Sequence, residues 1–273
     1  MANNKINLLV TFDKNYIKPF KTMLKSILIN NPKESLSVWL LHSAIPQCEL
    51  QALEEYCHLQ SVSFTSLEVD RTIFQNAPIS KRYPQEMYYR LLAPHLLPTS
   101  MEKILYLDPD ILVINPLRPL WDIDLNHYAF AAASHTGITD IINGINRVRL
   151  GTEHDYYNSG VMLIDLIKAR TIIKPDEIFK YVSKHESKLL LPDQDVFNSL
   201  YGTYTLPLDD AIWNYDARYY STYLIKSDGD YTLDWIIQNT RILHFCGKNK
   251  PWLPSYSRRF ATLYKHYMHI ANK

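Results

Sequence analysis

The chain has 273 residues, 47% of them hydrophobic, and a formal net charge of +1 at pH 7. This length suffices for one large α/β domain or two smaller ones, and the near-neutral charge argues against a nucleic-acid-binding protein. The three cysteines show no zinc-site or disulfide spacing, the N-terminal apolar run is too short for a signal peptide, and no run has the length of a membrane span. We therefore expect a cytoplasmic protein.

The first part of the chain alternates between predicted strands and predicted helices. The expected elements are strands at Ile6–Val10, Val38–Leu41 and Val62–Val69, with helices from Ile17 to Leu28 and from Pro46 to His58. This β-α-β-α-β order implies a parallel sheet, in which ligands bind beyond the carboxyl ends of the strands. Neither the glycine fingerprint of a dinucleotide fold nor that of a P-loop is present.

The second part continues this alternation with less regular connections. The expected elements are helices at Glu86–Leu92 and Pro175–Glu186, a helix beginning at Asp193, and strands at Ile104–Leu107, Ile111–Ile114, Tyr128–Ala133 and Val161–Asp165. Residues 134–155 indicate an exposed loop or a short helical excursion. Residues 201–235 show little periodicity, which is typical of a lid or an acceptor site, and Trp213–Tyr223 is the best candidate for the acceptor side. We expect a main domain over residues 1–252 and a tail over 253–273.

Two carboxylates interrupt an otherwise apolar stretch in the middle of the chain. Asp108 and Asp110 flank Pro109 between two buried strands, and residues i and i+2 of an extended backbone point to the same side. Such carboxylates repel each other unless a cation lies between them, and oxygen ligands favour Mg²⁺ or Mn²⁺. The alternative is an ordinary strand end at which Asp108 caps a turn.

Four motifs in order give the sequence a specific resemblance. They are Ile104–Asp110 (I-L-Y-L-D-P-D), Asn158–Asp165 (N-S-G-V-M-L-I-D), Asp193–Asn198 (D-Q-D-V-F-N) and His244–Trp252 (H-F-C-G-K-N-K-P-W). Together they resemble glycosyltransferase family 8, which includes bacterial lipooligosaccharide galactosyltransferases and glycogenin, over most of the chain. The resemblance implies an α/β fold of the GT-A type, with a mixed, mainly parallel central sheet flanked by helices. It also implies a UDP-sugar donor, dependence on Mn²⁺ or Mg²⁺, and retention of the anomeric configuration.

The resemblance also assigns a metal site and phosphate contacts. The implied metal ligands are Asp108, Asp110 and His244. Gly247 would let the backbone approach a phosphate, and Lys250 would supply a charge to it, with Lys248 as the alternative phosphate contact. Taken alone, His244 would be interpreted as a satisfied core histidine.

Residues from two further segments are assigned to the nucleotide by the same resemblance. The positions implied for the base and ribose are Thr11, Asp13, Asn15 and Tyr16, with Asp13 at the uracil edge. Arg90 matches an arginine near the diphosphate and the donor sugar, and Asp108 is assigned to the donor as well as to the metal. The alternative for Arg90 is a salt-bridged residue on a helix surface.

The donor sugar is assigned to Asn158, Asp193 and Gln194. Gln194 would lie beside the anomeric carbon, where retaining glycosidases place a carboxylate nucleophile. A neutral glutamine is a poor nucleophile, so we favour front-face displacement, in which the acceptor attacks while UDP leaves. Gln194 would steady the positive charge on the sugar ring and Asp193 would orient its hydroxyls. The alternative is a helix N-cap with acids at the favourable end of the helix dipole.

The sequence thus predicts a retaining hexosyltransferase that moves galactose or glucose from a UDP-sugar to a saccharide, glycolipid or glycoprotein acceptor, as in bacterial cell-surface polysaccharide synthesis. The alternative is a non-catalytic UDP-sugar or carbohydrate-binding protein on the same scaffold. A metal-dependent phosphohydrolase would need a water-activating base, for which the sequence offers no dedicated candidate.

The C-terminal residues predict a basic amphipathic helix over 257–273, with Ser257 as its N-cap. Its apolar stripe is Phe260, Leu263, Tyr264, Tyr267 and Ile270, and its cations are Arg258, Arg259, Lys265 and Lys273. Such a helix could hold the enzyme at the inner face of an anionic membrane. The alternative is that the stripe packs on the domain.

Overall fold

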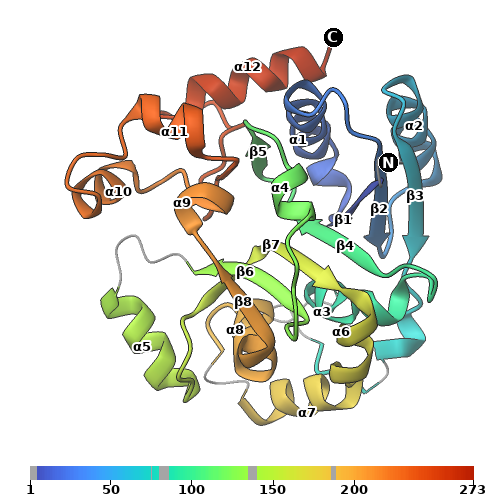
Figure 1. The fold of residues 1–273 in the computed structure, drawn as a ribbon. Coiled ribbons are helices and arrows are strands. Elements are labelled where there is room, and N and C mark those ends of the chain that lie inside the picture. The colour runs from blue at the N-terminus through green and yellow to red at the C-terminus, as the bar shows by residue number, and fades with distance from the viewer. Residues whose placement is uncertain (1–4, 75, 80–85, 135–139, 186–188) are drawn as a thin grey trace.

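The computed structural model describes residues 5–74, 76–79, 86–134, 140–185 and 189–273. Its centre is a seven-stranded sheet of order β3-β2-β1-β4-β7-β6-β8 (Figure 1). The strands are β1 (Ile6–Thr11), β2 (Leu36–His42), β3 (Ser63–Glu68), β4 (Lys103–Leu107), β6 (Phe130–Ser134), β7 (Tyr157–Asp165) and β8 (Thr205–Leu208). β7 runs antiparallel to both its neighbours, and the other pairs are parallel. The predicted mixed, mainly parallel sheet is confirmed.

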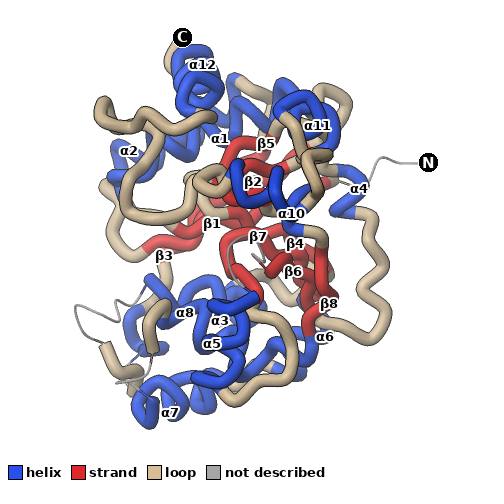
Figure 2. The backbone as a smooth tube through the Cα atoms, turned by 90° about the vertical axis from the view of Figure 1, so that its left-hand side faces the viewer, coloured by secondary structure: helices blue, strands red, loops and turns tan. Residues whose placement is uncertain are grey.

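Helices cover both faces of this sheet, as the two views of the molecule show (Figures 1 and 2). One face carries α1 (Ile17–Asn30) and α2 (Gln47–Leu59), and the other carries α3 (Glu86–Leu96), α6 (Leu166–Ile172), α7 (Pro175–His185) and α8 (Pro192–Tyr201). Successive strand residues alternate between the two cores: Leu8 and Val10 pack with α1 and α2, whereas Leu9 faces the other layer. Period-two alternation in a sheet buried on both sides explains why these strands are apolar throughout.

A second, three-stranded sheet joins the C-terminal part of the chain to the centre. It has the order β5-β10-β9 and consists of β5 (Ile111–Val113), β10 (Ile242–His244) and β9 (Tyr215–Asp216). Because β10 pairs with β5, residues near 244 lie beside the segment that connects β4 to β5. Residues more than one hundred positions apart in the sequence therefore meet at the carboxyl end of β4.

The remaining elements are helices and 3-10 turns. They are α4 (Arg118–Trp121), α5 (Asp140–Leu150), α9 (Asp210–Trp213), α10 (Tyr220–Lys226), α11 (Leu233–Asn239), α12 (Ala261–Ala271), and the 3-10 turns η1 (Lys14–Tyr16), η2 (Arg71–Phe74) and η3 (Gly202–Tyr204). Of the predicted segment 134–155, residues 135–139 lie outside the described residues, and α5 confirms the helical alternative for the part that follows. The weak periodicity of 201–235 arises because several short elements follow one another there. The predicted end of the 175–186 helix, Glu186, lies outside the described residues.

The C-terminal helix differs from its prediction in both extent and surroundings. α12 begins at Ala261 rather than near Ser257, and Phe260, at its N-cap, makes no side-chain capping bond. Tyr264 is fully buried and Tyr267 nearly so, and the Asn30 amide of α1 donates to the Tyr267 hydroxyl at 2.9 Å. The stripe therefore packs on the protein, which confirms the packing alternative for this helix. Within the described residues, none of the helices combines the length and apolarity that crossing a bilayer requires.

Candidate active site

The two carboxylates and the distant histidine converge where β4 ends and β5 begins. His244 Nε2 lies 3.3 Å from Asp110 Oδ1 and 3.8 Å from Asp108 Oδ2. One ligand atom from each of the three residues falls within 4.8 Å of the others. The β5–β10 pairing sets this geometry, because it places His244 opposite Ile111. Two carboxylate oxygens and one imidazole nitrogen form a donor set that suits a divalent cation such as Mn²⁺.

β7 packs directly against this group through a residue without a side chain. The Asp108 N–H donates to the carbonyl of Gly160 at 2.8 Å. A Cβ atom at Gly160 would lie 2.4 Å from His244 Cε1 and 2.7 Å from Asp108 Oδ2. Only glycine lets the strand approach so closely, which explains its place in the Asn158-Ser159-Gly160 motif.

Lys250 and His244 balance the buried charge of Asp110. Lys250 forms an ion pair with Asp110 and also donates to the Phe245 carbonyl at 3.2 Å. Burial alone would raise the pKa of Asp110, but His244 and Lys250 hold it well below its usual range. Burial would lower the pKa of His244, whereas Cys246 and Asp110 raise it well above its usual value. A ligand imidazole must be neutral, so His244 would hold a metal ion in its neutral form.

Arg90, on α3, connects the carboxylate group to the start of α8. Its guanidinium lies 3.0 Å from Asp108 Oδ1 and 3.2 Å from Asp193 Oδ2, and it also donates to the Ser159 carbonyl at 3.2 Å. The Tyr106 hydroxyl donates to the same Asp108 oxygen at 2.6 Å. Burial would lower the pKa of Arg90, but Asp108 above all raises it. Arg90 is thus a partly buried cation held by two carboxylates, rather than a salt-bridged residue on a helix surface.

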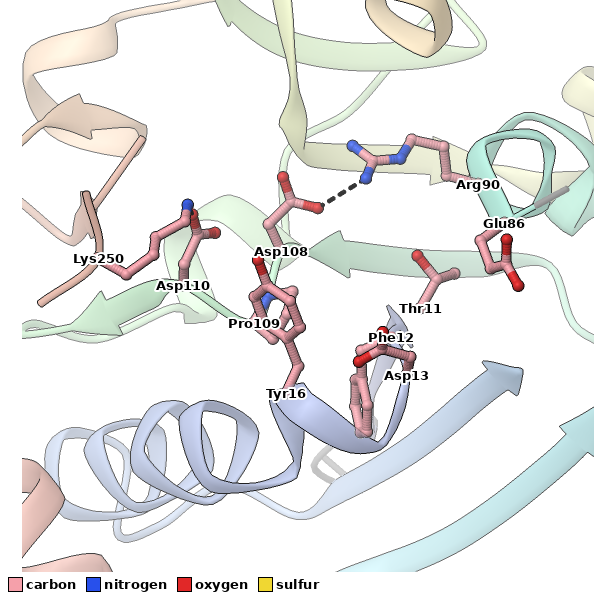
Figure 3. A pocket seen from close by; sticks show the side chains of 10 residues that line it. All are labelled: Thr11, Phe12, Asp13, Tyr16, Glu86, Arg90, Asp108, Pro109, Asp110 and Lys250. Atoms are coloured by element: carbon pink, nitrogen blue, oxygen red, sulfur yellow. Dashed lines mark hydrogen bonds and ion pairs between the residues drawn. The ribbon is translucent and has the colours of Figure 1, made fainter. Parts of the chain in front are cut away.

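These groups border a pocket of about 480 Å³ at the carboxyl ends of β1 and β4 (Figure 3). The lining residues are Thr11, Phe12, Asp13, Tyr16, Glu86, Arg90, Asp108, Pro109, Asp110 and Lys250. Figure 3 shows Lys250 and Asp110 at one side, Arg90 and Glu86 at the other, and Asp108 between them. Seven residues predicted for the metal and nucleotide therefore share one pocket, whereas Phe12, Glu86 and Pro109 had no predicted role there.

Local hydrogen bonds hold the N-terminal wall of the pocket. The Asp13 carboxylate accepts from Asn15 N at 2.8 Å and from Asn15 Nδ2 at 3.1 Å, so it caps η1. Asn15 does not line the pocket and instead supports Asp13. Tyr16 meets the ring of Trp252 edge to face at 5.5 Å. Gly247 adopts a φ of +87° and is not among the lining residues, and a Cβ atom there would lie 2.9 Å from Arg218 Nη1.

The residues predicted to hold the sugar lie where α8 meets β7. Asn158 Nδ2 donates to Gln194 Oε1 at 3.1 Å. The Asn198 side chain accepts from Tyr157 N at 2.7 Å and donates to Tyr157 O at 2.8 Å, which fixes α8 against this strand. The predicted alternative of an acidic N-cap is wrong in detail, because Leu191 is the N-cap and the acids lie in the first turn.

Asn214 is a site residue that the sequence analysis did not identify. It is fully buried just before β9, and its side chain contacts both Asn158, at 3.0 Å, and His244, at 2.8 Å. No spacing or periodicity in residues 201–235 marks it. Its only signal is a polar amide between two aromatic residues, Trp213 and Tyr215.

Comparison with known proteins identifies the family and the fold of the chain. Glycosyl transferase family 8 matches residues 7–255. General stress protein A of Bacillus subtilis is 29% identical, covering 94% of this chain and 90% of its own length, and lipopolysaccharide 1,2-glucosyltransferase of Escherichia coli K12 is 26% identical, covering 90% and 72%. The solved structure of the galactosyltransferase LgtC with donor and acceptor sugar analogues matches with a TM-score of 0.80 at 21% identity, covering 97% and 96%, which shows the shared fold.

The family match covers nearly the whole described chain and includes every motif that builds the pocket. The α/β architecture matches that of the LgtC structure over almost its full length. The chain therefore belongs to glycosyltransferase family 8 and is a glycosyltransferase with a GT-A fold.

Proposed function

We propose that the protein is a retaining hexosyltransferase that transfers galactose or glucose from a UDP-sugar with the help of Mn²⁺ or Mg²⁺. The observation that carries this proposal is the convergence of Asp108, Asp110 and His244 within 4.8 Å at the wall of a pocket that also contains two cations. A diphosphate is the substrate group that such a combination suits. Cytoplasmic location follows as part of the proposal from the free, scattered cysteines.

Asp108, Asp110 and His244 would hold the metal ion, which would neutralise charge on the departing UDP. The Lys250 ammonium pairs with Asp110 at the pocket wall, and in the donor complex it would bind a phosphate oxygen in place of this carboxylate. Arg90 is held by two carboxylates and offers the opposite side of the pocket a fixed positive charge. Thr11, Asp13 and Tyr16 would then face the nucleoside, with Asn15 orienting Asp13.

Gln194, Asp193 and Asn158 would surround the donor sugar. The neutral Gln194 amide is held by Asn158, so its carbonyl dipole is oriented before substrate binds. In the reaction, the bond between the anomeric carbon and the UDP oxygen breaks while the acceptor hydroxyl adds on the same face. The leaving phosphate takes the hydroxyl proton. The amide of Gln194 steadies the positive charge that develops on the ring, and no covalent enzyme intermediate is required.

A second cavity of about 450 Å³ supports an acceptor site with a preference for anionic saccharides. It is lined by Ala217, Arg218, Tyr220, Ser221, Arg258 and Arg259, which include part of the predicted acceptor stretch. Arg218 is fixed by Asp216 at 2.6 Å, and the guanidinium of Arg259 stacks over Tyr220 at 4.0 Å. Relatives include enzymes named as lipopolysaccharide glucosyltransferase and galactosyltransferase. We accordingly propose a phosphorylated or carboxylated glycoconjugate as acceptor.

The alternative of a non-catalytic sugar-binding protein makes a different prediction for turnover. UDP-galactose and UDP-glucose should each be incubated with the protein, Mn²⁺ and a panel of saccharides, while UDP release is followed by chromatography. The proposed enzyme should release UDP from at least one donor, and this release should stop when EDTA is added. Tight UDP-sugar binding without any release would favour the binding protein.

A further inference from the structure

We infer that Asn214 is a positioning residue that fixes both the metal-facing nitrogen of His244 and the amide of Gln194. The inference rests on the proposed function and extends it to a residue in the segment that precedes β9. Its basis is a chain of side-chain hydrogen bonds that runs from Gly160 through Asn158 and Asn214 to His244, with a branch to Gln194.

The direction of the chain is set at Gly160. Its backbone N–H donates to Asn158 Oδ1 at 2.9 Å, and a backbone N–H cannot act as an acceptor. The Asn158 amide is therefore oriented with its oxygen toward Gly160 and its nitrogen toward Gln194. Asn158 Nδ2 donates to Gln194 Oε1 at 3.1 Å, which fixes the orientation of the glutamine amide as well.

The orientation of Asn158 also fixes the orientation of the Asn214 amide beside the histidine. Asn214 Nδ2 donates to Asn158 Oδ1 at 3.0 Å, so its own oxygen faces His244 Nδ1 at 2.8 Å. Because an amide oxygen can only accept, Nδ1 must carry a hydrogen. The other ring nitrogen, Nε2, faces the Asp108 and Asp110 carboxylates and is the atom left to bind a metal ion.

Because these side chains are buried, water cannot easily take the place of a lost hydrogen-bond partner. Asn214 is fully buried and His244 is 3% exposed. Removing one partner would leave buried polar groups without their hydrogen bonds, which is costly in a closed environment. One side chain thus supports the metal ligand on one side and, through Asn158, the sugar-facing amide on the other.

Two substitutions separate these roles. Asn214→Ala removes both bonds, whereas Asn214→Asp keeps an acceptor for His244 Nδ1–H but loses the donor to Asn158. Mn²⁺ affinity, measured by EPR of the free ion with and without UDP, should fall about 10- to 100-fold in Asn214→Ala. It should stay at the wild-type value in Asn214→Asp. UDP-sugar turnover should fall at least about tenfold in both.

Matched controls distinguish this inference from a general loss of structure. Asn239→Ala removes another partly buried amide, which donates to the Trp235 carbonyl at 2.9 Å within α11, and should leave both readouts unchanged. Gln194→Ala should slow turnover and leave Mn²⁺ affinity intact. Wild-type Mn²⁺ affinity in Asn214→Ala, or equal loss in Asn214→Ala and Asn214→Asp, would overturn the inference. Absence of Mn²⁺ binding in the wild-type protein would instead contradict the proposed function.

Discussion

Gly160 and His244 lie so close that β7 has no room for a side chain beside the metal-facing histidine. A Cβ atom on Gly160 would come within 2.4 Å of His244 Cε1, well inside van der Waals contact. The strand that supplies Asn158 and the strand that supplies His244 are therefore positioned by direct contact. This closeness couples the sugar-holding motif to the carboxylate group.

Gly160→Ala should displace His244 and Asp108 and weaken Mn²⁺ binding. Overpacking of this kind typically lowers the free energy of unfolding by about 1 to 3 kcal/mol. Calorimetric titration and thermal unfolding would measure the two effects. The control is Gly144→Ala on α5, where an added Cβ meets no atom within 4 Å and should leave Mn²⁺ affinity unchanged. Normal Mn²⁺ affinity in Gly160→Ala would show that the site tolerates the added methyl group.

Gln194→Ala should slow sugar transfer but leave measurable activity, because the amide stabilises charge without forming a covalent bond. Gln194→Glu should not increase the rate, since front-face displacement does not use a nucleophile at this position. NMR of the product should show the α configuration of the donor retained. A β product would refute the retaining assignment, and a faster Gln194→Glu variant would favour a covalent intermediate.

Arg259→Ala should reduce transfer to anionic acceptors selectively. Arg259 lines the second cavity and is stacked on Tyr220 rather than placed in the donor pocket. Loss of one charged contact should lower kcat/KM for a phosphorylated or carboxylated saccharide by about tenfold, while neutral saccharides are little affected. Parallel kinetics with acceptor pairs that differ only in the anionic group would measure this. Equal losses for both members of each pair would place the acceptor's anionic group elsewhere.

The cysteines should differ strongly in reactivity at mildly alkaline pH. Burial raises the pKa of Cys57 to about 12, so its thiol stays protonated and enclosed, whereas Cys48 is exposed. Because the thiolate is the reactive form, iodoacetamide at pH 8 should label Cys48 and spare Cys57 until the protein unfolds. Peptide mass spectrometry with and without denaturant would follow both sites. Rapid labelling of Cys57 in the folded protein would contradict the packing of α2.

The sequence predicts the parts of this structure that local pattern controls. Apolar runs located β1 to β7, whereas β8, β9 and β10 were not predicted. The i, i+2 spacing predicted that Asp108 and Asp110 face one point, and their carboxylates do converge on His244, although residues 109–110 form a turn rather than extended backbone. The meeting of Asp110 with His244 depends on β5–β10 pairing, which no local pattern encodes; the family resemblance supplied it. Asn214 was missed because its role arises from contacts with two distant segments. The C-terminal stripe was correctly identified, but periodicity alone does not distinguish a stripe that packs on α1 from one that faces lipid.

Metal-dependent turnover distinguishes a metal-assisted transferase from the alternatives, and Asp110 is the ligand at which to test it. UDP release from UDP-galactose and UDP-glucose should be measured with Mn²⁺, with EDTA, and in Asp110→Ala, alongside calorimetric titration of UDP. The wild-type protein should release UDP only with the metal, and EDTA and Asp110→Ala should each strongly weaken UDP binding. Unchanged UDP affinity without metal, or turnover that EDTA does not affect, would contradict metal-assisted transfer.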